Sequence, residues 1–149
     1  MTTTTKTKMT VTTKFGTFAR TTARAYTHMV ITTGPSVAQQ VARIKKNLDY
    51  ALQEKAKYDA VLTRNDPAEI AHGFCEWTRA TWEGFRAATE RQIASYTAEL
   101  NSLANAPEPT EYKAHSWSSR LALALKEAAK AREFNANVRV IEIATGNEV

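Results

Sequence analysis

The segment HSWSSR, residues 115–120, places serine hydroxyls and an arginine directly before a helix-like run, LALALKEAAKAR. A helix N-terminus exposes unpaired backbone N–H groups and carries partial positive charge, so it attracts anions. Ser116, Ser118 and Ser119 would add hydroxyl donors, and Arg120 a guanidinium fork suited to phosphate. Serines are also ordinary helix caps, with Trp117 as a hydrophobic staple. The segment therefore predicts either an anion site or only the start of a helix.

A second group of candidate residues lies in FARTTARAYTH, residues 18–28. Arg20 and Arg24 flank an expected turn, and Tyr26 and His28 follow on one face of the next strand. Cationic forks for phosphate and a ring for stacking suit a nucleotide or a nucleic-acid backbone. The alternative is a solvated outer face of a half-buried sheet. The predicted phosphate or nucleic-acid site comprises Arg20, Arg24, Tyr26, His28, Ser118, Ser119 and Arg120.

A third group is aromatic and lies in FCEWTRATWEGF, residues 74–85. Trp77 and Trp82 are five residues apart, which places them on distinct sides of a helix. Most of these rings are expected in the core, but aromatic anchors are also enriched in binding interfaces. Trp77, Trp82 and Phe85 are the tentative partner interface, and a homo-oligomer through this region is an expectation.

Catalysis has little support in the sequence. His72 and Glu76 share a helix face, but HGFCE is not a metalloprotease motif. Cys75 and His72 are poorly spaced for a nucleophile and its base on one helix, so the cysteine is expected as a small buried hydrophobe. We therefore expect no enzyme activity, no metal and no cofactor.

Composition places the chain in the globular class. It has 149 residues, of which 43% are hydrophobic and 23% charged, and a formal net charge of +5. The positive charge favours acidic partners such as nucleic acid, nucleotides or an acidic protein. The sequence lacks an apolar run of about 18 residues and a secretory signal, which predicts a soluble protein that does not enter a membrane. A lone cysteine fits a reducing cytoplasm.

The elements that must position these residues begin with two strands. Residues 1–10 are expected to be a flexible tail, and residues 11–22 and 23–33 to pair through a turn near 21–23. Gly16 within the first strand is expected to mark a bulge or a close backbone approach. In the second strand the set that includes Met29 and Ile31 is expected to face the core. Ser36 is expected to cap the helix that follows.

Residues 36–104 predict a long antiparallel helical hairpin, since apolar residues recur at four-three spacing in two runs. Asp66 and Pro67 are expected to start its second helix. A possible short strand at 111–117, a helix over 118–134 with Leu121, Leu125 and Ala128 on one side, and a strand at 138–144 follow. The predicted fold is one α+β domain: a small antiparallel sheet packed with one helix (11–33 and 111–145), with the hairpin inserted.

The terminal pieces TFARTTARAYTHMVI and HSWSSRLALALKEAAKAR with VRVIEI resemble those of small accessory proteins carried by bacteriophages and plasmids. The likeness covers less than half the chain and excludes the hairpin. It implies an accessory protein that acts in the cytoplasm of a bacterial host, binding a host protein or a host signalling molecule, with counter-defence as an option.

Two functions are therefore expected. The first is a non-enzymatic protein that binds a macromolecular partner of the host through its helical hairpin, as a homo-oligomer. The alternative is a nucleotide or nucleic-acid binding or sequestering module that uses the arginine, histidine and serine cluster of the base.

Overall fold

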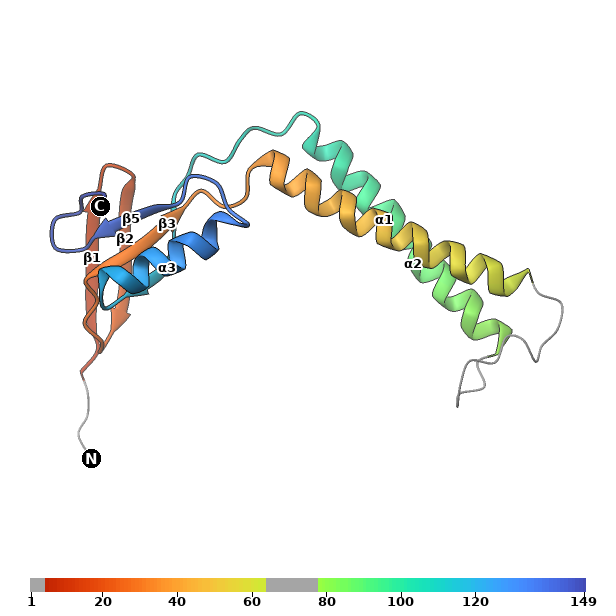
Figure 1. Cartoon of the computed structure of the whole chain (residues 1–149), viewed down its shortest axis with the longest axis horizontal. Helices are drawn as coiled ribbons and strands as arrows, with labels where there is room; N and C mark the ends of the chain where they lie inside the picture. Colours follow the sequence, from red (N-terminus) through yellow and green to blue (C-terminus); the bar gives the residue numbers. More distant parts are fainter. Residues whose placement is uncertain (1–4, 64–77) are drawn as a thin grey trace. The chain divides into compact units, whose positions relative to one another are not determined.

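The computed structural model describes residues 5–63 and 78–149 (Figure 1). The chain divides into two compact units: a base unit, residues 1–39 with 107–149, and a hairpin unit, residues 40–106. The expected mixture of helices, antiparallel strands and a helical hairpin is confirmed.

The base unit begins with a two-stranded antiparallel ribbon, β1 (Thr7–Thr13) and β2 (Gly16–Thr22). Thr13 pairs with Gly16, so the turn lies at residues 14–15 and not near 21–23 as predicted. Gly16 is no bulge; it follows the turn with a φ of 132°, a conformation that favours glycine. The predicted flexible tail is also wrong in its last residues, because Thr7–Thr10 pair with β2 and Met9 packs on the core.

A three-stranded antiparallel sheet lies at the centre of the base unit, in the order β4 (Lys113–Ser118), β3 (His28–Thr32), β5 (Arg139–Glu142). The predicted short strand and final strand are thereby confirmed. The register of β4 shifts where Val30 pairs with Ser116 and Ile31 with Ala114, which leaves His115 as a bulge.

Both faces of β3 are buried. Met29 and Ile31 pack with Val11 and Phe18 of the ribbon, which confirms the predicted core face. Val30 was expected on the outer face, but its side chain is 0% exposed because helix α3 (Leu121–Arg132) covers that side. The ribbon and α3 therefore enclose the sheet as two outer layers (Figure 1).

Helix α3 packs on the sheet through alanines. Ala124, Ala128 and Ala131 are buried, whereas Leu125, predicted on the packed side, is 47% exposed. Residues 124, 128 and 131 share one stripe of the helix, and Leu125 lies about a quarter-turn away from it. Small side chains on this stripe allow the helix axis to approach the sheet closely.

The helical hairpin consists of α1 (Val37–Leu62) and α2 (Arg79–Leu103). The predicted cap of α1 is confirmed: Ser36 Oγ accepts from Gln39 N–H at 3.1 Å, and Gln39 Oε1 accepts from Ser36 N–H at 2.8 Å. This reciprocal pair is a capping box. The start predicted for the second helix at Asp66 and Pro67 lies outside the described residues. Within the described ranges, every helix is too short or too polar to cross a bilayer.

Candidate functional site

A hollow of about 380 Å³ in the base unit gathers four of the predicted site residues: Arg24, Tyr26, Ser118 and Ser119. Its remaining lining is Ala25, Ser116, Trp117, Leu123 and Glu127. We call it the serine hollow. It is built from the connection between β2 and β3, the C-terminal end of β4 and the first two turns of α3.

The connection that carries Arg24 and Tyr26 is fixed at both ends. The Arg24 N–H donates to Thr22 Oγ1 at 2.9 Å, which holds the chain at the end of β2. Before β3, the Thr27 N–H donates to the Ser118 carbonyl at 3.0 Å, and the Thr27 carbonyl accepts from the Ile143 N–H at 2.9 Å. This anchoring places Arg24 beside the end of β4.

Arg24 supplies the positive charge of the serine hollow. Its side chain is exposed, and in the described part of the chain no carboxylate lies within ion-pair distance of its guanidinium. Because the guanidinium carries five N–H donors in a rigid fork, it is available to hold a phosphate or carboxylate on two oxygens.

Two aromatic rings stand beside this cation. The rings of Tyr26 and Trp117 have centroids 6.2 Å apart and are tilted by 55°. The Arg20 guanidinium lies 4.9 Å from the centroid of the Tyr26 ring, within the range of a cation–π contact. Arg20 thus contacts a residue of the hollow but does not line the hollow itself.

Ser116 is the residue of the hollow with an unmet hydrogen bond. Its Oγ is buried and has no hydrogen-bond partner within the described residues. Ser116 pairs with Val30, and Ser118 with His28, so the two serines share the face of β4 that looks toward α3. A buried hydroxyl without a partner costs free energy unless a ligand or water satisfies it.

The explanation of Ser118 as a simple helix cap is wrong. Ser118 belongs to β4 and is 5% exposed, and α3 begins three residues later at Leu121. Arg120 occupies the N-cap position with extended backbone, and no side chain there makes a capping hydrogen bond. Ser116 and Ser118 are therefore strand residues that line the hollow, and Ser119 lies between β4 and α3.

Besides Arg20, two further predicted site residues do not line the serine hollow. Arg120 is exposed at the N-cap of α3, and His28 lies in β3 with its Nδ1 2.8 Å from Thr27 Oγ1. Neither lines the hollow. Glu127, which is not among the predicted site residues, does line the hollow. The sequence signal for it is its place two turns after Ser119 in an amphipathic helix.

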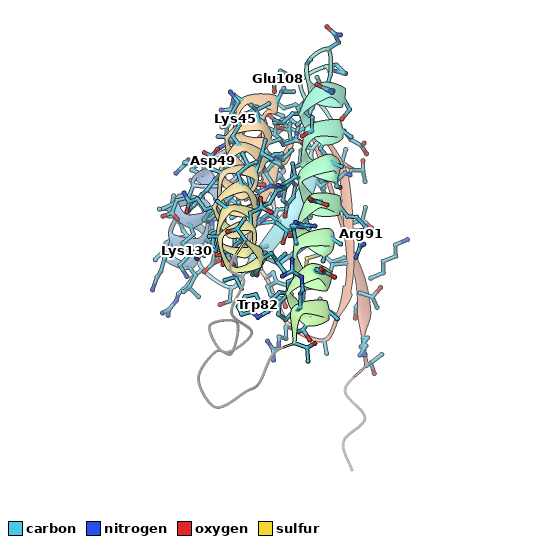
Figure 2. All side chains as sticks on the ribbon, turned by 90° about the vertical axis from the view of Figure 1, so that its right-hand side faces the viewer. Lys45, Asp49, Trp82, Arg91, Glu108 and Lys130 are labelled. Carbon is cyan, nitrogen blue, oxygen red and sulfur yellow. The ribbon has the colours of Figure 1, made fainter. Side chains whose placement is uncertain are left out.

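One residue of the predicted partner interface, Trp82, is internal to the hairpin unit. Trp82 is buried and projects from α2 toward α1, where it packs with Leu62 (Figure 2). Its ring centroid lies 5.9 Å from that of Tyr58, and Phe85 completes the cluster at 5.8 Å from Tyr58 with 36% of its surface exposed. Trp77, the remaining member of the predicted interface, lies outside the described residues.

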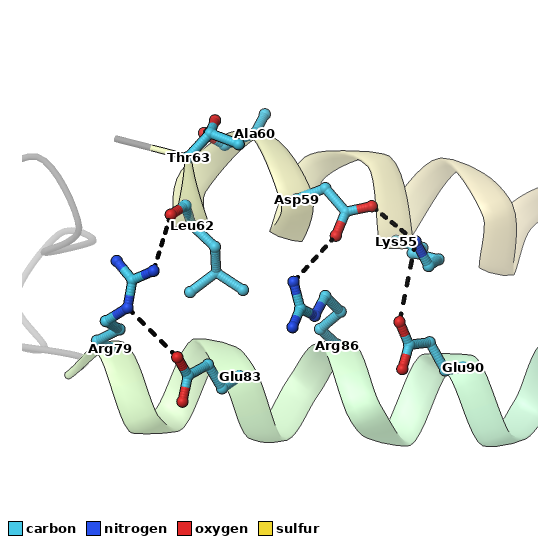
Figure 3. A network of polar contacts seen from close by, with 9 residues as sticks. All are labelled: Lys55, Asp59, Ala60, Leu62, Thr63, Arg79, Glu83, Arg86 and Glu90. Atoms are coloured by element: carbon cyan, nitrogen blue, oxygen red, sulfur yellow. Dashed lines mark hydrogen bonds and ion pairs between the residues drawn. The ribbon is translucent and has the colours of Figure 1, made fainter. Parts of the chain in front are cut away.

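Ion pairs join α1 and α2 beside these rings (Figure 3). Asp59 Oδ1 lies 3.6 Å from Arg86 Nη1 of α2, and Asp59 Oδ2 accepts from Lys55 Nζ at 2.8 Å. The hydrogen bond from Lys55 lowers the pKa of the Asp59 carboxyl. These contacts link the two helices beside the aromatic cluster.

The residues weighed for catalysis, His72, Cys75 and Glu76, lie outside the described residues. In residues 5–63 and 78–149, no group of three histidine, cysteine, aspartate or glutamate side chains could hold a metal ion.

Comparison of the chain with protein-family models, with curated proteins and with solved structures gave no match. The fold and the hollow thus define an α+β protein with a cationic, aromatic and hydroxyl-lined depression in its base unit. The resemblance to phage and plasmid accessory proteins stays a prediction.

Proposed function

We propose that the base unit binds a nucleotide or a nucleic acid in the serine hollow. The observation that carries this proposal is that an unpaired guanidinium and a pair of aromatic rings line one depression, together with three serines, of which Ser116 has a buried hydroxyl without a partner among the described residues. A volume of about 380 Å³ suits a small ligand, since ligand pockets commonly measure about 300 to 1,000 Å³.

Four of the lining residues have a chemical role in this proposal. Arg24 would hold a phosphate in a bidentate fork. Trp117 and Tyr26 would stack on the base, an interaction that tolerates any base because each has a π-face. The Glu127 carboxylate would accept from a base N–H group, such as N3–H of thymine.

The distribution of charge supports an anionic ligand. Residues 1–48 contain no aspartate or glutamate, and the first acidic residue of the chain is Asp49. The N-terminal part of the base unit therefore contributes five basic residues and no acidic one: Lys6, Lys8, Lys14, Arg20 and Arg24, of which Lys14 pairs with Glu148. In the remainder of that unit, residues 107–149, six basic and six acidic residues balance. The positive excess thus coincides with the ribbon and with Arg24.

The test is equilibrium binding of a fluorescein-labelled single-stranded dT12 by fluorescence anisotropy, at several salt concentrations. We expect binding that weakens with salt, and we expect Arg24→Ala to weaken it and to reduce the magnitude of the salt slope by about 0.7, the value for one lost phosphate contact on a single strand. Lys45→Ala in the hairpin unit removes the same charge elsewhere and is the matched control. Equal effects of the two variants, or no binding by the wild type, would remove the proposal.

The helical hairpin supports a second candidate function, association with a second copy of this chain. The buried side chains among its described residues are Ile44, Ala51, Leu62, Trp82 and Thr89. Tyr50 and Leu52 of α1 are 65% and 47% exposed. Because long helices in water rely on packing an apolar face, a second hairpin that covers these side chains would stabilise the first.

Light scattering tests this second candidate. We expect a mass above that of one chain at micromolar concentration and a lower mass for Leu52→Lys. Gln53→Lys, at the neighbouring exposed position of α1, is the control and should keep the higher mass. A wild-type monomer would remove self-association through the hairpin.

The resemblance of the terminal segments would place either activity in a bacteriophage or plasmid accessory protein of the bacterial cytoplasm. A protein of that kind would act on a host partner through its hairpin or sequester a host nucleotide in its hollow, which is the link to counter-defence. Binding of nucleotides from a bacterial extract, identified by mass spectrometry and lost in Arg24→Ala, would support sequestration.

A further inference from the structure

A second hollow, of about 310 Å³, adjoins the serine hollow in the base unit. Its lining is Thr5, Thr7, Lys8 and Met9 at the start of the ribbon, with Thr22, Ala23, Arg24 and Ala25 after β2. We call it the threonine hollow. Arg24 and Ala25 line both depressions, so the two hollows share one wall.

We infer that the two hollows form one track for linked nucleotides, with a phosphate at Arg24 and the next nucleotide in the threonine hollow. This inference rests on the function proposed above and narrows its ligand class to single-stranded oligonucleotides. A mononucleotide would fill one hollow and leave the other empty. A linked pair would occupy both and share the guanidinium that stands between them.

The chemistry of the threonine hollow fits a sugar–phosphate backbone. Its lining contains Lys8 and the hydroxyls of three threonines, and it contains no carboxylate. The side chain of Lys8 is exposed and makes no ion pair with any described carboxylate. Ammonium and hydroxyl donors bind phosphate oxygens without reading sequence. The serine hollow, by contrast, holds the aromatic rings and Glu127.

The aromatic rings of the serine hollow and the basic lining of the threonine hollow together favour a single-stranded ligand over a duplex. Trp117 and Tyr26 can stack only on a base whose face is accessible, and the bases of a duplex are stacked on one another. A basic track with stacking platforms is the arrangement that proteins use for single-stranded nucleic acid.

The length of the ligand is the variable that tests the inference. Isothermal titration compares thymidine monophosphate, the dinucleotide pTpT and inorganic tripolyphosphate, each with the wild-type protein. We expect pTpT to bind severalfold more tightly than the mononucleotide, since its second nucleotide adds backbone contacts to Lys8 and the threonines of the second hollow. Tripolyphosphate should bind more weakly than pTpT because it has no base.

Lys8→Ala separates the two hollows. It should lower the affinity for pTpT severalfold and leave the affinity for the mononucleotide unchanged. Lys113→Ala, at the other end of β4 from Ser118, removes an equal charge from the same unit and should change neither affinity. Circular dichroism confirms that each variant is folded.

The possible failures are distinguishable. Equal affinities for pTpT and the mononucleotide, an unchanged affinity of Lys8→Ala for pTpT, or tripolyphosphate binding as tightly as pTpT would overturn the inference and leave the serine hollow as a mononucleotide or phosphate site. The absence of binding by any of these probes and by dT12 would overturn the proposed function as well.

Discussion

The Arg20 guanidinium lies 4.9 Å from the centroid of the Tyr26 ring, which joins the ribbon to the wall of the serine hollow. Arg20 pairs with Met9 in the ribbon, and Tyr26 contacts Trp117 of β4. A cation over the ring restricts its tilt. The structure thus gives Arg20 a positioning contact in place of the direct phosphate contact that the sequence suggested.

Replacement of Arg20 should therefore weaken ligand binding indirectly, through the position of the Tyr26 ring. An exposed cation–π contact contributes about 0.5–1 kcal/mol, so Arg20→Ala should lower the affinity for dT12 by about two- to fivefold. The salt slope should stay that of the wild type, because no phosphate contact is removed. Arg20→Lys should recover part of the affinity. A salt slope that falls in magnitude by about 0.7 in Arg20→Ala would instead assign Arg20 to a phosphate.

The convergence of Arg24 with Ser118 could be expected from the sequence, but the position of Arg20 could not. The order of strands and helices follows from hydrophobic periodicity. An arginine in the connection between two strands lies where those strands end. The turn was misplaced because Thr-rich residues on both sides of Gly16 have equal strand propensity. Only the pairing of Thr7–Thr10 with β2, a tertiary feature, fixes the turn at residues 14–15.

The packed face of α3 shows a second limit of sequence reasoning. Leucine is the more hydrophobic residue, so Leu121 and Leu125, with Ala128, define the expected stripe. The structure buries Ala124, Ala128 and Ala131 against β3 and β5, with Leu121 partly buried beside them, and leaves Leu125 exposed. The spacing of either stripe is helical, and propensity alone cannot choose between them.

The alanine stripe makes a stability prediction. Ala128 is fully buried, so Ala128→Leu should overpack the α3 side of the sheet and lower the free energy of unfolding by about 1–3 kcal/mol. Ala129→Leu, one position along at an exposed site, should change it by less than about 0.5 kcal/mol. Urea unfolding monitored by circular dichroism measures both. Equal unfolding midpoints would show that α3 does not pack tightly here.

Gly146 makes a different prediction, because it meets the ribbon. A Cβ added there would lie 2.3 Å from the carbonyl oxygen of Thr12, and the φ of Gly146 is 69°. Gly34 has a φ of 82° but no atom within 4 Å of an added Cβ. Gly34→Ala should thus lower the free energy of unfolding by about 1–2 kcal/mol through backbone strain alone.

Gly146→Ala should lower the free energy of unfolding by more than Gly34→Ala does, since backbone strain and a clash with the backbone of β1 act together. Thermal unfolding of both variants gives the comparison. Because the clash displaces β1, Gly146→Ala should also speed amide hydrogen exchange in residues 7–13, which Gly34→Ala should not. Similar losses in the two variants would mean that the chain near Gly146 moves freely away from the ribbon.

The pair between Asp59 and Arg86 predicts acid sensitivity of the hairpin. The hydrogen bond from Lys55, together with the charge of Arg86, holds the pKa of Asp59 below its ordinary value, and Glu90 shares the Lys55 ammonium at 3.9 Å. A carboxyl whose pKa is lower in the folded state stabilises that state above its unfolded pKa of about 3.9 and loses this contribution as the pH falls through the folded pKa.

The thermal midpoint of the wild type should therefore fall more steeply than that of Asp59→Asn as the pH is lowered below about 4. Asparagine keeps the shape of the side chain but cannot titrate, so carboxyls elsewhere, such as Glu148 beside Arg139, contribute equally to both proteins and cancel in the difference. Circular dichroism at 222 nm follows the helices directly. Parallel curves for the two proteins would mean that the contacts of Asp59 with Lys55 and Arg86 do not stabilise the hairpin in solution.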